Sequence, residues 1–372
     1  MPEALQILFV VFSGLLGVCV GSFLNVCIYR LPRDDLSVNR PVRSFCPTCG
    51  HAIAWFDNLP LLSWLALGGR CRACRAPIAS RYLIVEALTA TLFVIVAWRY
   101  LCGDEVSWGA YFSLLSLITA LIVASFIDLD LRILPDEITV GGMIVAPFVV
   151  LLVPELHTRP VDGSISWGLV SVQTALAPIS ASLPATLRLP AVTCLLAALV
   201  AGVGAAVGVF GYSWYWRWTR GGERRPLRAG VLGGVLLAIA GASATVAFLH
   251  PETMLSPRMY ALWAAFAGMA AGAGLVFLVG VVGTRVFRKP AMGFGDVKLM
   301  GLLGAFTGWG GVIVGFFVAC FLGSVIGIYI LVRYRSRYLP FGPFLALGCL
   351  ATILWPEALR AAFDWYLSWM RV

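Results

Sequence analysis

The sequence predicts an all-α polytopic membrane protein with about ten transmembrane helices and one small loop domain outside the membrane. Of the 372 residues, 60% are hydrophobic and 12% are charged, against about 45–50% and about 25% in soluble domains. The apolar residues gather into runs close to the length of about 20 residues that a helix needs to cross a bilayer. The 39 glycines agree with this, because small residues let membrane helices approach closely.

The predicted spans follow the apolar runs in order. The first, residues 5–27, comes after an acidic start that lacks the positive segment of a secretory signal, so we expect a retained membrane helix. The other nine are expected at residues 83–102, 108–127, 138–153, 190–212, 229–249, 260–284, 297–310, 311–332 and 341–356.

Arginine residues indicate which loops face the cytoplasm. The polar segment 28–82 holds eight arginines, and basic residues concentrate in cytoplasmic loops. Alternating the ten spans from an outer N-terminus places 21 of the 27 basic residues on the inner side. We therefore expect a first transmembrane helix at 1–27, a cytoplasmic loop domain at 28–82 and a multi-helix membrane domain at 83–372.

The loop domain contains two Cys-x-x-Cys pairs. Cys46 and Cys49 form the first pair and Cys71 and Cys74 the second, with 21 residues between the pairs. This is close to the spacing of a four-cysteine zinc site, in which each turn directs two thiolates at one metal ion. Disulfide bonds are the alternative, but they need an oxidising compartment. The sequence therefore predicts a zinc-binding loop domain, with a structural ion because protein ligands fill all four positions.

Acidic residues lie at the ends of two apolar runs. Asp128 directly follows the run 121–127, and Asp296 closes the sequence Gly293-Phe294-Gly295-Asp296. A carboxylate at the membrane edge is costly and marks a candidate functional site. The glycines leave room for an extended peptide beside Asp296. Two carboxylates that share one proton can act as acid and base, which is the arrangement an aspartyl protease needs.

Three further charged residues accompany this pair. Asp130 and Asp136 are the nearest alternatives to Asp128. We interpret Asp130 as part of a solvated loop and Asp136 as the N-cap of the next helix. Lys298 has three interpretations: it orients the two aspartates, it binds a substrate carboxylate, or its long side chain extends to the membrane interface.

An ordered set of motifs runs along the chain: Gly21-Ser22-Phe23-Leu24-Asn25-Val26, Tyr29-Arg30-Leu31-Pro32, both cysteine pairs, Asn58-Leu59-Pro60-Leu61 with Ser63-Trp64-Leu65, Arg81-Tyr82 with Val85-Glu86, Ile127-Asp128 through Pro135-Asp136, Gly293 to Lys298, and Pro340-Phe341-Gly342-Pro343-Phe344. This set resembles the prepilin peptidases, which belong to the GxGD aspartyl proteases and serve type IV pili and type II secretion. The resemblance does not cover residues 155–285, which are longer than is usual for the family and predict an inserted helical region.

The resemblance implies that Asp128 and Asp296 are the catalytic residues. It implies an endopeptidase of the bacterial cytoplasmic (inner) membrane that removes the basic leader of type IV prepilins or pseudopilins on the cytoplasmic side. Many members then methylate the new N-terminus with S-adenosylmethionine. No Gly-x-Gly-x-x-Gly motif follows a strand here, so the sequence identifies no residues for that methyl donor.

Two other classes of function remain open at this stage. A transporter would also use membrane-edge acids and glycine-broken helices, but it does not explain the four-cysteine loop. A zinc-loop scaffold could hold nucleic acid, yet residues 28–82 contain no lysine, and Trp55, Phe56 and Trp64 lie in apolar segments. We therefore expect the lipid bilayer and pilin precursors as partners, and no nucleic acid.

Overall fold

The computed structural model describes residues 2–33, 38, 44–46, 48–102, 106–158, 257–289, 291–335 and 339–370. Within these residues the structure is helical, and the extended pairings are two isolated bridges, Phe45–Ala52 and Arg70–Pro77. The predicted all-α class is therefore confirmed. The chain divides into two compact units, Met1–Ile138 and Thr139–Val372, and each is described by itself.

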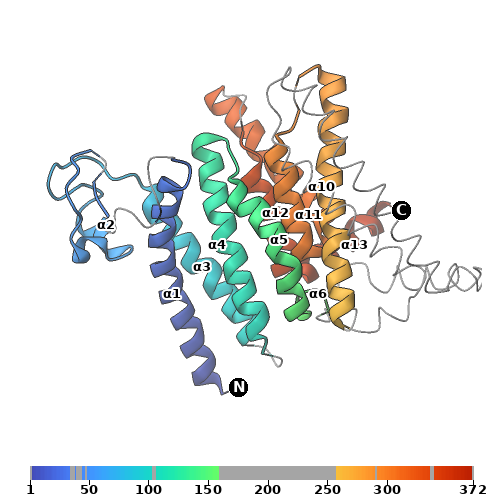
Figure 1. The fold of residues 1–372 in the computed structure, drawn as a ribbon, viewed down its shortest axis with the longest axis horizontal. Helices are drawn as coiled ribbons and strands as arrows, with labels where there is room; N and C mark the ends of the chain where they lie inside the picture. The colour runs from blue at the N-terminus through green and yellow to red at the C-terminus, as the bar shows by residue number, and fades with distance from the viewer. Residues whose placement is uncertain are drawn as a thin grey trace, which may run out of the picture. The chain divides into compact units, whose positions relative to one another are not determined.

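Figure 1 labels the helices of both units. The first unit contains α1 (Glu3–Arg30), the 3-10 helix η1 (Trp55–Asn58), α2 (Leu62–Ala66), α3 (Arg81–Leu101) and α4 (Trp108–Leu131). The second contains α5 (Asp136–Leu152), which begins at the boundary, α6 (Glu155–Thr158), α10 (Pro257–Phe287), α11 (Phe294–Tyr334), α12 (Gly342–Leu354) and α13 (Pro356–Met370).

Several of these helices are long and apolar enough to cross a bilayer, so the protein is a multi-pass membrane protein. In the described part of the chain five helices meet this condition: α1, α3, α4, α10 and α11. The bent pair of α12 and α13 would make six. The predicted spans 190–212 and 229–249 lie outside the described residues, and so does most of the predicted insertion within 155–285. The total of ten spans therefore stays a prediction.

In the first unit, α1, α3 and α4 pack side by side. A Cβ atom on Gly21 of α1 would lie 2.7 Å from the Cα atom of Glu86 in α3, so the two backbones touch. The hydroxyl groups of Ser13 and Tyr111 lie 2.6 Å apart and join α1 to α4. An ion pair between Arg81 and Asp130 joins the start of α3 to the end of α4. The cysteine loop and the end of α4 therefore lie at the same end of this bundle (Figure 1).

In the second unit, α11 folds back on itself at Gly308, whose backbone has φ 69° and ψ 175°. A Cβ atom on Gly272 of α10 would lie 2.3 Å from the carbonyl oxygen of Met300 and 2.9 Å from Cγ2 of Val312. In a straight helix these two residues would be separated by about 18 Å. The chain therefore reverses at Gly308, which gives two adjacent halves that correspond to the predicted spans 297–310 and 311–332.

His157 of α6 packs against this reversal. Its Nε2 atom lies 2.9 Å from the carbonyl oxygen of Ala305, three residues before the break. A Cβ atom on Gly308 would lie 3.6 Å from His157 Nδ1, so the ring lies directly beside the break. Burial lowers the pKa of His157 to about 4, although the bond to Ala305 acts in the opposite direction. The ring is therefore neutral near pH 7 and donates from Nε2.

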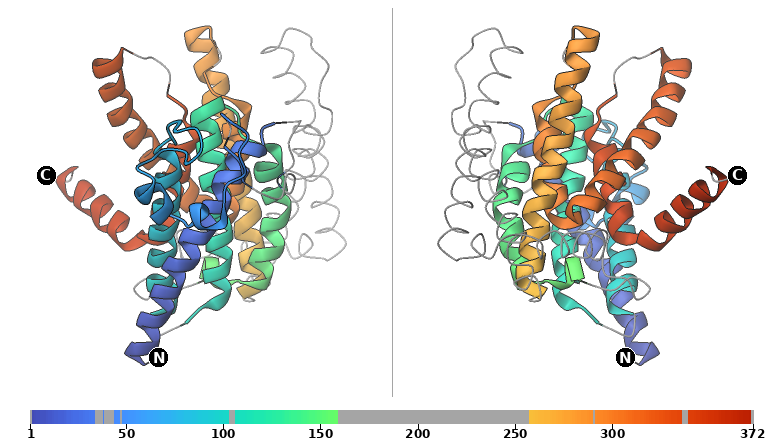
Figure 2. Two further views of the ribbon diagram at one scale, coloured as in Figure 1. Left: turned by 90° about the vertical axis from the view of Figure 1, so that its left-hand side faces the viewer. Right: turned by 90° about the vertical axis from the view of Figure 1, so that its right-hand side faces the viewer.

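The chain ends with an abrupt change of direction. The axes of α12 and α13 differ by 97°, and Figure 2 shows α13 leaving α12. Trp365 and Trp369 of α13 are 68% and 76% exposed. Tryptophan is enriched where a membrane meets water, so the direction and composition of α13 suit a helix that lies along the bilayer surface.

We predict that His157→Leu lowers the free energy of unfolding by about 1–3 kcal/mol, because it leaves the buried carbonyl of Ala305 without this donor. Thermal unfolding in detergent measures the loss. His157→Gln keeps a donor and should recover most of it. Equal losses in both variants would contradict the proposed role of the hydrogen bond.

The same residue gives a pH dependence with a definite sign. An unfolded histidine takes up a proton near pH 6.5, whereas folded His157 stays neutral down to about pH 4. Stability contributed by the neutral ring is therefore lost as the pH falls from 6.5 towards 4. Between pH 7 and pH 5, the wild-type melting temperature should fall more than that of His157→Gln.

Candidate active site and metal centre

The two Cys-x-x-Cys pairs form turns of the same kind. In the first, the backbone N–H of Gly50 donates to the carbonyl oxygen of Cys46 at 2.8 Å; in the second, that of Arg75 donates to Cys71 at 3.0 Å. Both residues that follow the pairs have left-handed backbone, with φ 70° at Gly50 and 60° at Arg75. Each turn thereby presents two thiol groups on one side of the backbone.

The two turns bring all four predicted cysteines together. The sulfur atoms of Cys46, Cys49, Cys71 and Cys74 lie within 4.8 Å of one another, and those of Cys46 and Cys74 are 3.9 Å apart. Four thiolates at Zn–S distances of about 2.3 Å around a tetrahedral ion would be about 3.8 Å apart. None of these cysteines is in a disulfide bond. The donor set and its spacing therefore fit a tetrahedral metal ion.

The local backbone favours the thiolate at one of these positions. Hydrogen bonds from the backbone of Cys49 and Thr48 lower the pKa of Cys46 to about 6 against the opposing effect of burial. The backbone of Ala76 acts in the same direction on Cys74, but the neighbouring thiols and burial outweigh it and raise its pKa to about 11. Thiols packed this closely resist ionising together, and a bound cation removes that conflict because it deprotonates its thiol ligands.

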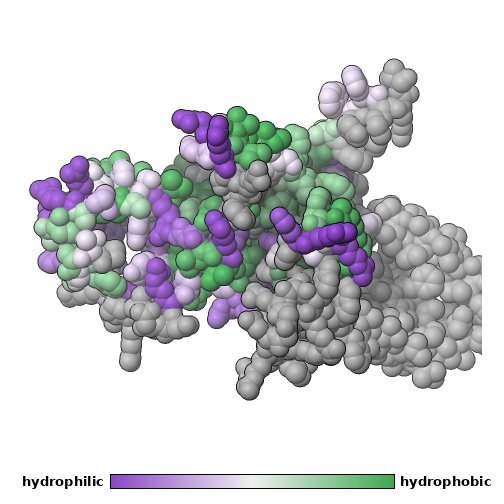
Figure 3. All heavy atoms as spheres, turned by 90° about the horizontal axis from the view of Figure 1, so that it is seen from above, coloured by the Kyte–Doolittle hydropathy of each residue, from purple (hydrophilic) through white to green (hydrophobic). Residues whose placement is uncertain are grey.

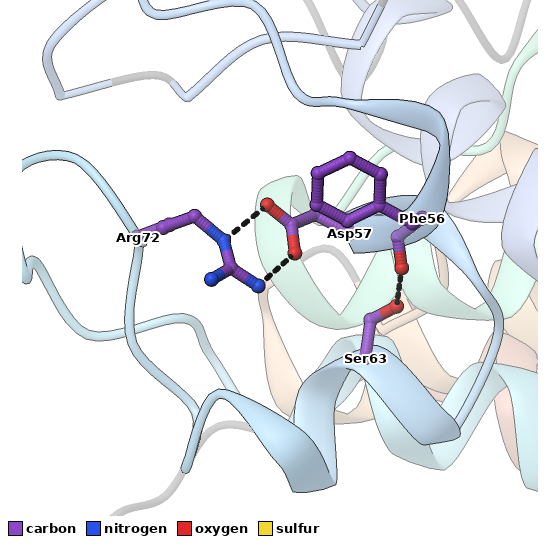
Figure 4. A network of polar contacts seen from close by, with 4 residues as sticks. All are labelled: Phe56, Asp57, Ser63 and Arg72. Atoms are coloured by element: carbon purple, nitrogen blue, oxygen red, sulfur yellow. Dashed lines mark hydrogen bonds and ion pairs between the residues drawn. The ribbon is translucent and has the colours of Figure 1, made fainter.

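Side-chain contacts hold the second turn against the rest of the loop. The guanidinium of Arg72 donates to both carboxylate oxygens of Asp57 in η1, at 2.7 and 2.6 Å (Figure 4). The hydrogen bond to Arg72 keeps the pKa of Asp57 below its usual value. The hydroxyl of Ser63 donates to the carbonyl oxygen of Phe56 at 2.9 Å. Figure 3 shows hydrophilic and hydrophobic side chains mixed on this loop, at the left of the view.

A buried carboxylate attaches the loop to the helices. Glu86 of α3 is buried beneath Gly21 of α1 and accepts a hydrogen bond of 2.7 Å from the backbone N–H of Leu61. Leu61 has φ 60° and ψ −51°, a backbone conformation that a residue with a Cβ atom rarely adopts. The bond to Glu86 supports this conformation, so the segment 58–61 is anchored on the membrane helices.

Asp128 lies in the last turn of α4, which continues to Leu131. The helix therefore extends four residues beyond the predicted span 108–127. The helix ends at Arg132, whose left-handed backbone N–H donates to the carbonyl oxygen of Asp128 at 2.9 Å. The Asp128 side chain is 7% exposed. The structure thus places a buried carboxylate at the end of the bundle that carries the cysteine loop.

Asp296 lies in the first turn of α11, with Gly293 as the N-cap. A Cβ atom on Gly293 would lie 3.2 Å from Asp296 Oδ2, so the absence of a side chain leaves space for this carboxylate. The preceding loop is fixed to α10 by Thr284, whose Oγ1 accepts from the N–H of Ala291 at 3.1 Å and donates to the carbonyl oxygen of Gly280 at 2.6 Å. Asp296 therefore has a defined place in the second unit, and Asp128 has one in the first.

The remaining charged residues of the prediction have different surroundings. Asp130 lies on α4 and pairs with Arg81, so its interpretation as a solvated loop residue is wrong in placing it outside the helix, although its side chain is exposed. Asp136 is the first residue of α5, so it lies at the start of the helix as predicted, but inside the helix and not at the N-cap position. The Nζ atom of Lys298 lies 5.4 Å from the centre of the Phe294 ring, a cation–π contact within the first turns of α11.

Sequence reasoning assigned no role to several of these residues. Glu86 and Arg81 stood in motifs without a stated function, and His157 was not singled out. A polar residue within an apolar helix signals a specific partner, which would have drawn attention to Glu86. No neighbouring residue in the sequence indicated a role for His157, because its hydrogen-bond partner, Ala305, lies 148 positions away in the chain.

Comparison with known proteins adds to this geometry. The sequence model of the family described as "Bacterial Peptidase A24 N-terminal domain" matches residues 15–100. That of the "Type IV leader peptidase family" matches residues 229–328. Asp296 lies inside the second match, and Asp128 lies between the two. The chain belongs to the type IV leader peptidase family.

Curated relatives extend the similarity to nearly the whole chain. The prepilin leader peptidase/N-methyltransferase of Aeromonas hydrophila is 29% identical over 384 residues, which are 95% of this chain and 92% of the relative. That of Pseudomonas aeruginosa is 28% identical over 380 residues, 95% and 93% of the two chains. That of Myxococcus xanthus is 51% identical over 145 residues, 39% and 41% of the two chains. No solved structure matches. These names favour a leader peptidase over the transporter and scaffold interpretations.

The two cysteine turns of this leader peptidase provide a matched test of backbone strain. Gly50→Ala should weaken metal binding about tenfold, because a Cβ atom at positive φ costs roughly 1–2 kcal/mol. No atom lies within 4 Å of the added Cβ position, so the backbone alone sets this cost. Arg75→Gly, at the equivalent place in the second turn, should not weaken binding. Transfer of the metal to a competing chelator measures the metal affinity of each variant. Equal weakening by Gly50→Ala and Arg75→Gly would show that backbone strain does not set the loss of affinity.

Proposed function

We propose that this protein is a membrane aspartyl endopeptidase that removes the basic leader of type IV prepilins or pseudopilins and then N-methylates the new N-terminus. The observation that carries the proposal is the family match over both ends of the chain together with the relatives that cover 95% of it. We place the enzyme in the bacterial cytoplasmic membrane, with its active site on the cytoplasmic side, because the arginine-rich loop lies at the same end of the first unit as Asp128.

We assign peptide hydrolysis to Asp128 and Asp296. In this mechanism one carboxylate takes a proton from water as the water oxygen attacks the scissile carbonyl carbon, and the other donates a proton to the carbonyl oxygen. The tetrahedral intermediate then collapses, the C–N bond breaks and the leaving amine takes up a proton. Asp296 lies at a helix N-terminus and Asp128 at a helix C-terminus. Helix N-termini favour negative charge, so we assign the water-activating role to Asp296 and the proton-donating role to Asp128.

We further propose that Cys46, Cys49, Cys71 and Cys74 bind one structural zinc ion. Four thiolates are a common closed donor set for zinc, with no position left for a reacting water. The ion would fix the two turns, and through them the loop that Glu86 anchors to α3. We also propose domain boundaries at 27/28 and 82/83, which divide the chain into a helix, a metal-stabilised loop and the membrane peptidase.

The central test is cleavage of a purified prepilin by the full-length protein in detergent. Asp128→Asn and Asp296→Asn should each lower the cleavage rate by at least about 10³-fold, since each removes one of two groups that act together. Asp130→Asn is the matched control on the same helix, and it should retain cleavage because it removes one partly exposed ion pair and keeps a hydrogen-bond acceptor for Arg81. Near-normal cleavage by either dyad variant would refute that assignment.

Metal analysis tests the loop separately. The purified protein should contain one zinc ion per chain, and serine at any one of the four positions should lower its affinity for zinc by more than about tenfold. Cys349→Ser, a change at a buried cysteine of α12 outside the cluster, is the control and should leave the zinc content unchanged. Disulfide-linked pairs without metal would overturn both the zinc site and the cytoplasmic location of the loop.

The two reactions should separate experimentally. Methyl transfer from S-adenosylmethionine needs the free amine that cleavage creates, and it does not need a shared-proton carboxylate pair. Asn variants of Asp128 and Asp296 should therefore still methylate a pilin supplied without its leader. Mass spectrometry of the pilin N-terminus detects the added methyl group. A wild-type protein that never adds it, even with donor present, would restrict the function to peptidase activity.

A further inference from the structure

A pocket lies in the first unit where α1 ends and α3 begins. The pocket opens to solvent, and none of its lining residues is acidic. The lining residues are Asn25, Val26, Tyr29, Arg30, Phe45 and Tyr82. Phe45 directly precedes the first ligand of the cysteine cluster, so one wall of the pocket belongs to the predicted zinc loop.

The pocket contains a buried hydrogen-bond acceptor with nothing to accept. Asn25 is 2% exposed, and its amide nitrogen lies 3.1 Å from the carbonyl oxygen of Tyr82 and 3.4 Å from that of Gly21. These two acceptors fix the orientation of the amide, because a flipped amide would set oxygen against oxygen. Within the described residues, Asn25 Oδ1 has no hydrogen-bond partner. A buried acceptor in this state costs about 1–3 kcal/mol, which a donating ligand would recover.

The other walls supply a fixed positive charge and aromatic surface. Arg30 is buried; its guanidinium donates to the carbonyl oxygen of Val38 at 2.9 Å and lies 6.0 Å from the centre of the Phe45 ring. Tyr29 and Tyr82 add two further rings, which already face the guanidinium groups of Arg33 and Arg81, 3.9 and 5.6 Å from the ring centres. Phe45 is therefore the ring considered for a ligand cation. Guanidinium groups bind carboxylates in defined geometry. Aromatic faces attract cations electrostatically, including cations that form no hydrogen bond.

These three features match a ligand that carries an ammonium donor, a carboxylate and a cation that forms no hydrogen bonds. The methionine portion of S-adenosylmethionine has all three, since its sulfonium is such a cation. We propose that this pocket binds S-adenosylmethionine through that portion, with the α-amino group on Asn25 Oδ1, the carboxylate toward Arg30 and the sulfonium beside the ring of Phe45. The inference rests on the proposed methyltransferase function and adds the side chains that hold its donor.

The test is direct binding of radiolabelled S-adenosylmethionine to the full-length, zinc-loaded protein in detergent, with no pilin present. Phe45→Leu should weaken binding about tenfold, in the upper range for a desolvated cation–π contact. Phe56→Leu is the matched control in the same loop, outside the pocket, and should bind as the wild type does. Asn25→Leu should also weaken binding, and melting temperature and zinc content identify any variant that does not fold.

A second ligand isolates the role of charge. S-adenosylhomocysteine keeps the amino and carboxylate groups but has a neutral thioether in place of the sulfonium. The wild type should prefer the charged ligand, and Phe45→Leu should lose most of that preference, whereas Phe56→Leu should keep it. If the wild type binds the donor but folded Phe45→Leu and Asn25→Leu bind it equally well, this pocket is the wrong site and the proposed function stands. If the wild type cleaves prepilin but binds no donor, the pocket and the methyltransferase function both fail.

Discussion

Contact between helix backbones is the interaction on which both units depend. A Cβ atom on Gly268 of α10 would lie 1.9 Å from the carbonyl oxygen of Gly304 in α11, and one on Gly348 of α12 would lie 2.2 Å from that of Gly315. Lipid tails are as apolar as the helices, so helix association in a bilayer relies on close packing instead of the hydrophobic effect. Any larger residue at these positions would separate α10, α11 and α12 and displace Asp296 with them.

The first unit uses the same close contact to bring polar groups to one end of a bundle. Once α1 and α3 touch at Gly17 and Gly21, the start of α3 can serve three partners. Arg81 pairs with Asp130 of α4, Glu86 receives the N–H of Leu61, and the backbone of Tyr82 receives the amide of Asn25. The start of α3 therefore contacts the cysteine loop, the end of α4 and the pocket at the end of α1, and it holds all three at one end of the bundle.

Much of this arrangement could be predicted because its signals are local. The apolar runs predicted the starts of α3 and α4 to within a few residues. The spacing of the four cysteines predicted that their sulfur atoms lie together. The predicted span ends at residue 127, four residues before the end of α4, because hydropathy reports where apolar residues stop, whereas the helix stops at the left-handed backbone of Arg132. The contacts of His157 and Asn25 could not be predicted, since each depends on a carbonyl group far away in the chain. The pairing of Asp128 with Asp296 stays a prediction for the same reason.

The reversal at Gly308 has a consequence for the thickness of the surrounding membrane. The half of α11 before it, residues 294–307, extends about 21 Å at 1.5 Å per residue, roughly 9 Å short of a typical hydrocarbon core. This is a hydrophobic mismatch, which membranes accommodate by local thinning or by helix tilt. If the reversal lay at one surface of an unthinned bilayer and the helix stood along its normal, Asp296 would lie below the level of the other surface. A substrate whose apolar helix begins at the scissile bond could then meet the carboxylate while that helix remains in lipid, without being lifted into water.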